Sequence, residues 1–380
     1  MQRAQWEAIS WDAPAFVLDS LSPVPAPATW LIRISEVFGE ATAEIIYGLG
    51  GTLAKRLGSE YHLIQVRDAA AIQSSDFAKY VRWNLPVEHA WPCNPEKMDG
   101  FVEKAAQAIF RKFAPRAPQA IFVGQLDPDP RNRYYKTLAS NLRGRTLQLF
   151  PKEIAGFKDP EAQEGGRPSL FCLLGKEGLF CGMQSPVMSN GFYPGGTKYI
   201  SQTSPDVISR AGAKIAEALH FLRLYRTNVR KNARWLELGA SPGGMTSELL
   251  DRGYRVIAID RAALDVRLDG RKGLNFSRMD VAAYRPAAGA VFDAILSDMN
   301  GDPRESFGQV LRLSACLTPG GIVIFTLKTQ GITSCDGMNT LHRFALDSAA
   351  VAGLHHLATT HLTYNRHEFT IFFELSPAPD

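Results

Sequence analysis

The stretch Trp235-Leu-Glu-Leu-Gly-Ala-Ser-Pro-Gly-Gly244 runs from an apolar segment into a glycine-rich turn. A second apolar segment, Val256-Ile-Ala-Ile-Asp260, follows it and ends on a carboxylate. This order predicts a strand, a tight turn, a helix and a second strand, which is the first βαβ unit of a nucleotide-binding α/β sheet. Glycines in such a turn let a ligand approach the backbone, and the acid can accept hydrogen bonds from ribose hydroxyls. The stretch therefore predicts the fold class and a cofactor with a nucleoside part.

The turn itself restricts the kind of cofactor. Its sequence, Gly239-Ala-Ser-Pro-Gly-Gly244, is neither the dinucleotide-binding Gly-x-Gly-x-x-Gly nor a phosphate-binding loop that ends in Lys-Ser/Thr. A proline and paired glycines suit a cofactor without a pyrophosphate, and we expect S-adenosylmethionine (SAM). The residues that we expect to bind it are Ser209, Glu237, Gly239, Ser241, Pro242, Gly243, Gly244, Met245, Asp260, Asp280 and Asp298.

Composition and charge narrow the class of protein. A chain of 380 residues suggests two or three domains, and 45% hydrophobic with 21% charged residues is ordinary for a globular protein. A net charge of +4 is compatible with a polyanionic partner but does not require one. The five cysteines are odd in number and lack metal-ligand spacing, so we expect reduced thiols and no metal. Without a membrane-length apolar run or a signal-peptide pattern, we expect a cytoplasmic protein.

The first half of the chain is expected to form two units. In residues 1–90, a proline-rich leader precedes a small ferredoxin-like α+β unit, which is indicated by a strand, a helix and a strand. A second unit is expected over residues 91–203, with a loop at 157–168 and a Gly/Ser/Pro-rich junction at 182–196. The predicted strands are 31–34, 62–66, 120–123, 146–150 and 170–174, and the predicted helices are about 38–48, 101–113 and 131–142.

The third domain is expected over residues 204–380, where apolar strands and amphipathic helices alternate. This alternation predicts a doubly wound, mostly parallel sheet of the Rossmann-like type. The link between the last two strands is too short for a parallel crossover, so we expect the final pair to be antiparallel. The predicted strands are 235–238, 256–259, 274–279, 294–297, 322–327, 356–362 and 369–375, and the predicted helices are 211–225, 245–252, 303–316 and 339–351.

Charged residues mark the carboxyl ends of the predicted strands, where ligands bind in open α/β sheets. Asp260 is placed for the ribose hydroxyls and Asp280 for the adenine amino group. Asp298 and Lys328 end adjacent strands. A partly buried lysine beside a carboxylate can be tuned for proton abstraction, and the same pair can equally be a salt bridge that closes the edge of the sheet. Glu368, on the final hairpin, supplies a second carboxylate.

In the order Lys214, Asp298, Lys328 and Glu368, these residues resemble the Lys-Asp-Lys-Glu tetrad of the FtsJ-type RNA 2′-O-ribose methyltransferases. The surrounding motifs agree: Ser209-Arg-Ala-Gly-Ala-Lys214, Leu238-Gly-Ala-Ser-Pro-Gly-Gly244, Ser297-Asp-Met299 and Asn365-Arg-His-Glu368. The resemblance covers about residues 204–376 and is strongest to members that methylate a cytidine of bacterial 23S rRNA. It implies that Lys328 is the general base, that Lys214 lowers the pKa of Lys328 by like-charge repulsion, and that Asp298 and Glu368 orient the ammonium groups.

The partner implied by this resemblance is RNA, and the segment Cys181–Lys198 resembles the end of a THUMP region. Residues 91–203 are therefore expected to form a THUMP-like RNA-binding domain. Single-stranded or looped rRNA is the expected target, because sequence-specific RNA readout prefers unpaired bases. The oligomeric state is open, with a monomer favoured. Candidate RNA contacts are Arg131–Lys136, Arg143, Arg145 and the run Arg223, Arg226, Arg230, Lys231 and Arg234, which has no acid within it and can equally be a solvated helix end.

Two other functions stay open at this stage. One is methylation of another RNA, such as a tRNA or a cap, or of a base. Methylation of a base nitrogen is disfavoured, because the fourth strand ends in Ser-Asp-Met-Asn300 and not in an Asn/Asp-Pro-Pro-aromatic clamp. The other is a non-catalytic RNA-binding assembly factor with the same fold.

Overall fold

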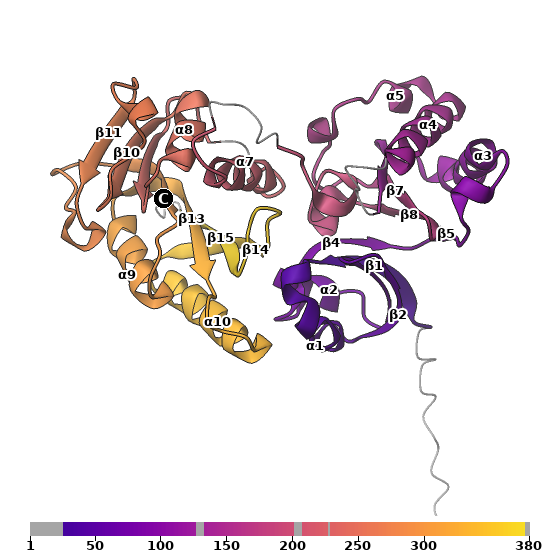
Figure 1. Cartoon of the computed structure of the whole chain (residues 1–380), viewed down its shortest axis with the longest axis horizontal. Coiled ribbons are helices and arrows are strands. Elements are labelled where there is room, and N and C mark those ends of the chain that lie inside the picture. Colours follow the sequence, from indigo (N-terminus) through magenta and orange to yellow (C-terminus); the bar gives the residue numbers. More distant parts are fainter. Residues whose placement is uncertain (1–25, 127–132, 201–206, 227–228, 377–380) are drawn as a thin grey trace, which may run out of the picture.

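The computed structural model describes residues 26–126, 133–200, 207–226 and 229–376. Three sheets follow one another along the chain (Figure 1). Most of the predicted leader, residues 131 and 132 of the predicted basic-aromatic segment, and the predicted start of the third domain at residue 204 lie outside the described residues.

The first sheet has four antiparallel strands in the order β2-β3-β1-β4. With α1 after β1 and the short α2 after β3, the connection is the βαββαβ of a ferredoxin-like unit, as expected. The prediction missed β2 because its five middle residues, 52–56, are all exposed and include Lys55 and Arg56, as in an edge strand. The bounds are β1 Ala28–Ile34, α1 Thr42–Gly48, β2 Gly51–Leu57, β3 Tyr61–Val66, α2 Ala71–Ser74 and β4 Val81–Pro86.

The second sheet has the order β5-β8-β7-β6, and its core is closed by the helices α3 and α4. The strand predicted at 146–150 is wrong: residues 146–149 are the last turn of α4. There the buried Thr146 hydroxyl donates to the Leu142 carbonyl at 2.8 Å instead of facing a neighbouring strand. The predicted junction also begins inside β8. The bounds are β5 His89–Trp91, α3 Phe101–Phe113, β6 Ile121–Gln125, α4 Tyr134–Leu149, α5 Lys152–Ala155, β7 Ser169–Gly175, β8 Gly178–Gln184 and α6 Pro186–Ser189.

The third sheet has seven strands in the order β11-β10-β9-β12-β13-β15-β14. The first five are parallel, and β15 is antiparallel to both of its neighbours, which confirms the predicted Rossmann-like sheet with an antiparallel final strand. Helices α7 and α8 pack on one face, and α9 and α10 pack on the other. The bounds are α7 Ala211–Leu222, β9 Arg234–Leu238, α8 Gly244–Asp251, β10 Arg255–Asp260, β11 Leu274–Arg278, β12 Phe292–Ser297, α9 Pro303–Ser314, β13 Leu317–Lys328, α10 Cys335–Val351, β14 Leu354–Thr360 and β15 Glu368–Leu375.

The ferredoxin-like unit packs against both of the other sheets. Phe38 stacks on Phe369 of β15 with ring centroids 5.5 Å apart, and Tyr80 meets Phe369 edge-on at 5.2 Å. On the opposite side, Trp83 of β4 meets Phe171 of β7 edge-on at 5.9 Å. The first unit therefore shares one buried core with the third sheet and another with the second sheet.

The domain limits placed after residues 90 and 203 stay predictions. Residue 90 lies inside β5, and residue 203 lies outside the described part of the chain. Among the described helices, none combines the length and the apolar content that a membrane crossing requires.

Candidate active site

The four residues of the predicted tetrad meet at one edge of the third sheet. The Lys328 ammonium lies 2.6 Å from Asp298 Oδ1 and 2.8 Å from Glu368 Oε2. The Lys214 ammonium lies 3.5 Å from Asp298 Oδ2 and contacts Glu368 Oε1. Each lysine is thus bridged to the other by both carboxylates, which gives a compact cluster of two positive and two negative charges.

The topology of the sheet explains this meeting. Lys328 is the last residue of β13 and Glu368 is the first residue of β15, and the two are direct partners in the antiparallel ladder. Because β15 is antiparallel to β13, it begins at the edge of the sheet where β13 ends. The first side chain of β15 therefore lies at this edge. Asp298 directly follows β12, and the Lys214 ammonium reaches the same edge from α7.

Burial makes these charges interact strongly. Their side chains are only 7–18% exposed. Burial by itself disfavours the charged form of Lys328, but Asp298 and Glu368 outweigh it and raise the pKa of Lys328 above its ordinary value. Burial opposes the charge of Glu368 as well, and the two lysines overcome it and lower the pKa of Glu368. We expected Lys214 to lower the pKa of Lys328. In the protein alone the two carboxylates raise this pKa instead.

A cavity of about 260 Å³ opens beside this cluster, above the glycine turn. Nine of the eleven residues predicted to bind the cofactor line it: Glu237, Gly239, Ser241, Pro242, Gly244, Met245, Asp260, Asp280 and Asp298. Ser209 lines a different cavity, and Gly243 is not among the lining residues. Gly243 instead shapes the turn: its φ is +107°, and a Cβ there would lie 2.3 Å from Leu268 Cδ1.

Gly239 is required by the close approach of two strand ends. Its φ is +80°, which favours glycine, and a Cβ at this position would lie 2.9 Å from the backbone Cα of Met299. The turn after β9 can therefore contact the segment after β12 only because residue 239 has no side chain. This contact forms the floor of the cavity, since both residues line it.

Asp260 and Asp280, which we expect to bind the ribose and the adenine, already accept hydrogen bonds from nearby backbone N–H groups. Asp260 Oδ2 accepts from the Ser241 N–H at 2.9 Å, and Asp260 Oδ1 accepts from the Ala262 N–H at 2.8 Å. Asp280 Oδ1 accepts from the Ala282 N–H at 2.8 Å. A carboxylate oxygen has two lone pairs, so these carboxylates can each accept further hydrogen bonds from a ligand.

Glu237 differs from the other acids of the cavity because it is fully enclosed. Its side chain is 2% exposed and accepts a hydrogen bond from the Thr246 hydroxyl at 2.7 Å. Burial, with help from the nearby Asp298, raises the pKa of Glu237 to about 8. The raised pKa favours the protonated form of Glu237, in which the carboxyl group can donate a hydrogen bond.

A second cavity of about 700 Å³ lies on the other side of the cluster. It shares Ala211 and Asn300 with the first cavity, and the tetrad lies where the two meet. The prediction gave no role to most of its lining, although Asn300 and Gln330 closely follow β12 and β13, residues 363–367 precede β15, and Arg210 precedes α7. The polar lining residues without a predicted role are Arg210, Asn300, Gln330, Thr363, Tyr364, Asn365, Arg366 and His367, of which Arg210, Asn365, Arg366 and His367 stand within the motifs quoted above.

The basic run 223–234 has no acid within it, but carboxylates from distant parts of the chain pair with it. Arg223 pairs with Glu161 at 2.6 Å and Arg226 with Glu374 at 2.6 Å. Asp293 accepts from the Arg230 side chain at 2.9 Å and from the Arg234 backbone N–H at 2.7 Å.

The two predicted arginines of α4 also have internal partners. The Arg143 guanidinium donates to the backbone carbonyls of Ile121 and Phe157, each at 2.9 Å. Arg145 pairs with Glu103 at 2.6 Å. Within the described ranges, no group of three or more His, Cys, Asp or Glu residues is arranged to hold a metal ion.

The part of the chain that holds most of this site is similar to known proteins. Residues 207–342 match the family model described as FtsJ-like methyltransferase. This part of the chain resembles an FtsJ-like methyltransferase domain. The match begins just before α7 and ends within α10, so it includes Lys214, Asp298 and Lys328 and stops before Glu368.

The relatives are proteins of one name, ribosomal RNA large subunit methyltransferase M. The relative from Thauera aminoaromatica is 29% identical over 175 residues, which are 44% of this chain and 46% of the relative. The relative from Laribacter hongkongensis is 28% identical over 174 residues, 44% of this chain and 48% of the relative. The chain thus spans about half the length of the curated relatives it matches. Among solved structures, the chain is similar to TrmN from Thermus thermophilus, with 15% identity, a TM-score of 0.34 and coverage of 91% of this chain and 99% of that one.

Proposed function

We propose that this protein is a SAM-dependent methyltransferase that modifies a ribose 2′-hydroxyl of large-subunit ribosomal RNA, and most specifically a cytidine of 23S rRNA. The observation that carries the proposal is the Lys214–Asp298–Lys328–Glu368 cluster at the junction of two cavities. One cavity has a glycine floor and carboxylates that can accept hydrogen bonds from a nucleoside. The other cavity has a polar and basic lining. The FtsJ-like domain and the names of the relatives support the same reaction and the same class of RNA.

The first cavity fits SAM. Its glycine floor leaves room for a ligand close to the backbone, Asp260 would accept from the ribose hydroxyls, and Asp280 would accept from the adenine amino group. Bound there, SAM would supply a methyl group on a positively charged sulfur that leaves as a neutral thioether, so the protein needs no acid for the leaving group.

The cluster would handle the proton of the attacking hydroxyl. Lys328, which lines the second cavity, would accept the proton from the ribose 2′-oxygen as that oxygen gains its methyl group. Asp298 and Glu368 hold the Lys328 nitrogen in place, and Lys214 balances their negative charge. Positioning of the two substrates in adjoining cavities supplies much of the rate.

Contact with RNA would begin at the second cavity. Arg210 and Arg366 line it and are exposed, and both suit backbone phosphates. Because most of the basic run 223–234 is already paired with acids, we place the first RNA contacts around this cavity and in the THUMP-like residues 91–203.

Mapping the product tests the proposal. The protein is incubated with labelled SAM and bulk RNA from a cell that lacks it, and the labelled nucleotide is identified after digestion. We expect one labelled ribose 2′-O-methyl nucleotide in large-subunit rRNA. A label on a base, on tRNA or on a cap would overturn the assignment of the substrate, and absence of transfer would leave the non-catalytic alternative.

A further inference from the structure

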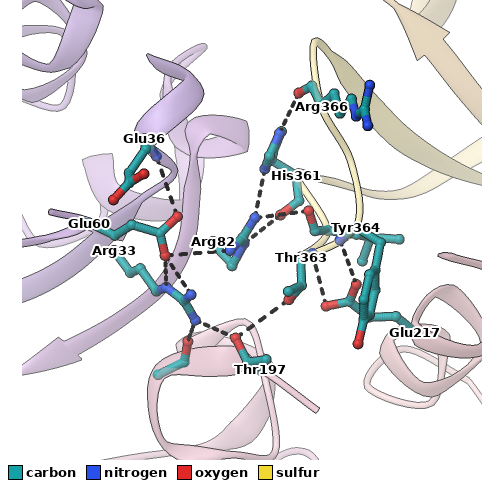
Figure 2. A network of polar contacts seen from close by, with 12 residues as sticks. Arg33, Glu36, Glu60, Arg82, Thr197, Glu217, His361, Thr363, Tyr364 and Arg366 are labelled. Atoms are coloured by element: carbon teal, nitrogen blue, oxygen red, sulfur yellow. Dashed lines mark hydrogen bonds and ion pairs between the residues drawn. The ribbon is translucent and has the colours of Figure 1, made fainter. Parts of the chain in front are cut away.

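A buried polar network connects the ferredoxin-like unit to the loop between β14 and β15 (Figure 2). Its centre is Arg82 of β4, whose side chain is 5% exposed. The guanidinium donates from Nε to the His361 carbonyl at 3.1 Å and from a terminal nitrogen to the Leu362 carbonyl at 2.9 Å. A side chain from one folding unit therefore holds the backbone of a loop in another.

His361 extends this contact toward the tetrad. Its Nδ1 lies 3.0 Å from the Arg82 guanidinium, which can only donate, so Nδ1 accepts and Nε2 carries the proton. Nε2 then donates to the Arg366 carbonyl at 2.8 Å. Burial and the charge of Arg82 lower the pKa of His361 to about 3, in keeping with a neutral ring. The chain of hydrogen bonds ends two residues before Glu368.

Glu217 of α7 holds the same loop from the opposite side. Its buried carboxylate accepts from the Thr363 N–H at 3.0 Å and from the Tyr364 N–H at 3.4 Å. Lys214 of the tetrad lies one turn earlier on the same helix. The loop is thus fastened both to the ferredoxin-like unit and to the helix that supplies a tetrad lysine (Figure 2).

Arg82 is itself fixed by further charges. Glu60 lies 3.7 Å from the Arg82 guanidinium and accepts from Arg33 Nε at 2.7 Å. Arg33 also donates to the Gly195 carbonyl in the segment that leads to the third sheet, at 2.7 Å. Burying an arginine is costly unless its charge and its donors are satisfied. Here Glu60 compensates the charge of Arg82. Three contacts of the Arg82 guanidinium go to residues 361 and 362 of the loop.

We propose that Arg82 and Glu217 are positioning residues for methyl transfer, which fix loop 361–367 and thereby place Glu368 against the two tetrad lysines. The inference rests on the proposed function. The same loop supplies five residues to the wall of the second cavity, so its position also shapes the substrate side. In this arrangement the ferredoxin-like unit completes the active site and is more than an arm that binds RNA.

The primary test is Arg82→Lys in the full chain. Lysine keeps the buried charge beside Glu60 but lacks the planar fork that reaches both carbonyls and His361. Displacements of about 1 Å can reduce rates by about 100-fold, so we expect kcat to fall at least about tenfold while the Kd of SAM stays within about threefold. If Glu368 is held less firmly, it stabilises the protonated form of Lys328 less, and the pKa of Lys328 falls. The increase of kcat with pH should then occur at lower pH.

Glu217→Gln provides an independent second variant, because it weakens the loop from α7 without touching the ferredoxin-like unit. We expect the same loss of kcat and the same shift of the pH profile. Tyr80→Phe is the matched control: the Tyr80 hydroxyl donates to Asn339 Oδ1 at 3.1 Å in the same interface, so this contact goes to α10 and not to the loop. If the two variants lose only thermal stability and keep the kcat and pH profile of Tyr80→Phe, the positioning role is refuted.

A measurement without RNA separates this inference from the proposed function. Amide hydrogen exchange at Thr363 and Tyr364 should be faster in Arg82→Lys and Glu217→Gln than in the wild type or in Tyr80→Phe. Unchanged exchange in both variants would overturn the inference. Absence of methyl transfer by the wild type would refute the proposed function and leave the exchange result to decide whether these residues hold the loop.

Discussion

At the scale of single residues, the site is a balance of four buried charges. Each carboxylate contacts both lysines, so removal of one member leaves an uncompensated charge among the other three. The balance favours protonated Lys328 in the protein alone, whereas the proposed base must be neutral. Two predictions follow from this conflict, one for the side chain and one for pH.

We expect Lys328→Ala to reduce methyl transfer by at least about 100-fold, because it removes the proton acceptor, and to leave the Kd of SAM within a few-fold. Single-turnover transfer from labelled SAM and calorimetric titration of SAM measure the two quantities. The exposed Lys272, changed to alanine, is the control for loss of a lysine from the same domain. Turnover by Lys328→Ala comparable to that of the wild type would exclude Lys328 as the base.

The rate should rise with pH. Since Asp298 and Glu368 raise the pKa of Lys328, the neutral amine is a small fraction at neutral pH and grows about tenfold per pH unit. We therefore expect kcat to increase with a slope near one on a logarithmic scale from about pH 6.5 to 9, measured under single-turnover conditions. A profile that is flat over this range would argue against a lysine base, provided that the protein stays folded throughout.

At the scale of elements, the glycine turn after β9 shows how backbone geometry makes a ligand site. Its cavity exists because two strand ends approach each other at a residue without a side chain. Two elements were harder to predict: β2 is exposed at residues 52–56, and the apolar residues at 146–150 have a pattern that fits a strand as well as a helix end.

Gly239→Ala is expected to weaken SAM binding at least about tenfold and to destabilise the fold by about 1–3 kcal/mol, because a Cβ would strike the Met299 backbone at a positive φ. Gly308→Ala is the matched control, since Gly308 lies inside α9 with open space around a Cβ and should gain stability from helix propensity. Titration of SAM and chemical denaturation of both variants test the difference. Equal SAM affinity in the two would mean that the contact with Met299 does not shape the cavity.

At the scale of the whole molecule, the ferredoxin-like unit packs against both the second and the third sheet and shares a core with each (Figure 1). Phe369, next to the tetrad residue Glu368, is covered by Phe38 and Tyr80 of that unit. Loss of the unit would expose this apolar surface and release the loop that Arg82 holds.

We therefore expect a fragment of residues 204–380 to bind SAM, because its cavity lies within the third sheet, but to methylate RNA poorly. The comparison uses equal concentrations of the folded fragment and the full chain, with folding checked by thermal denaturation. Full activity of the fragment would show that the first two units are dispensable, both for RNA binding and for the geometry of the site.

The Rossmann-like sheet, the glycine turn and the acids at the strand ends could be predicted from the sequence, because strand periodicity and turn chemistry are properties of short segments. The members of the cluster were predicted through the resemblance of local motifs to a family, and the length of one link predicted an antiparallel final pair. The fold was needed to show that carboxylates outweigh Lys214 at Lys328, that Glu161, Glu374 and Asp293 pair with the basic run, and that Arg82 reaches the loop before Glu368. The physical reason is common to all three: these are interactions of charges distant along the chain, and their strength depends on burial and distance, which the fold alone sets.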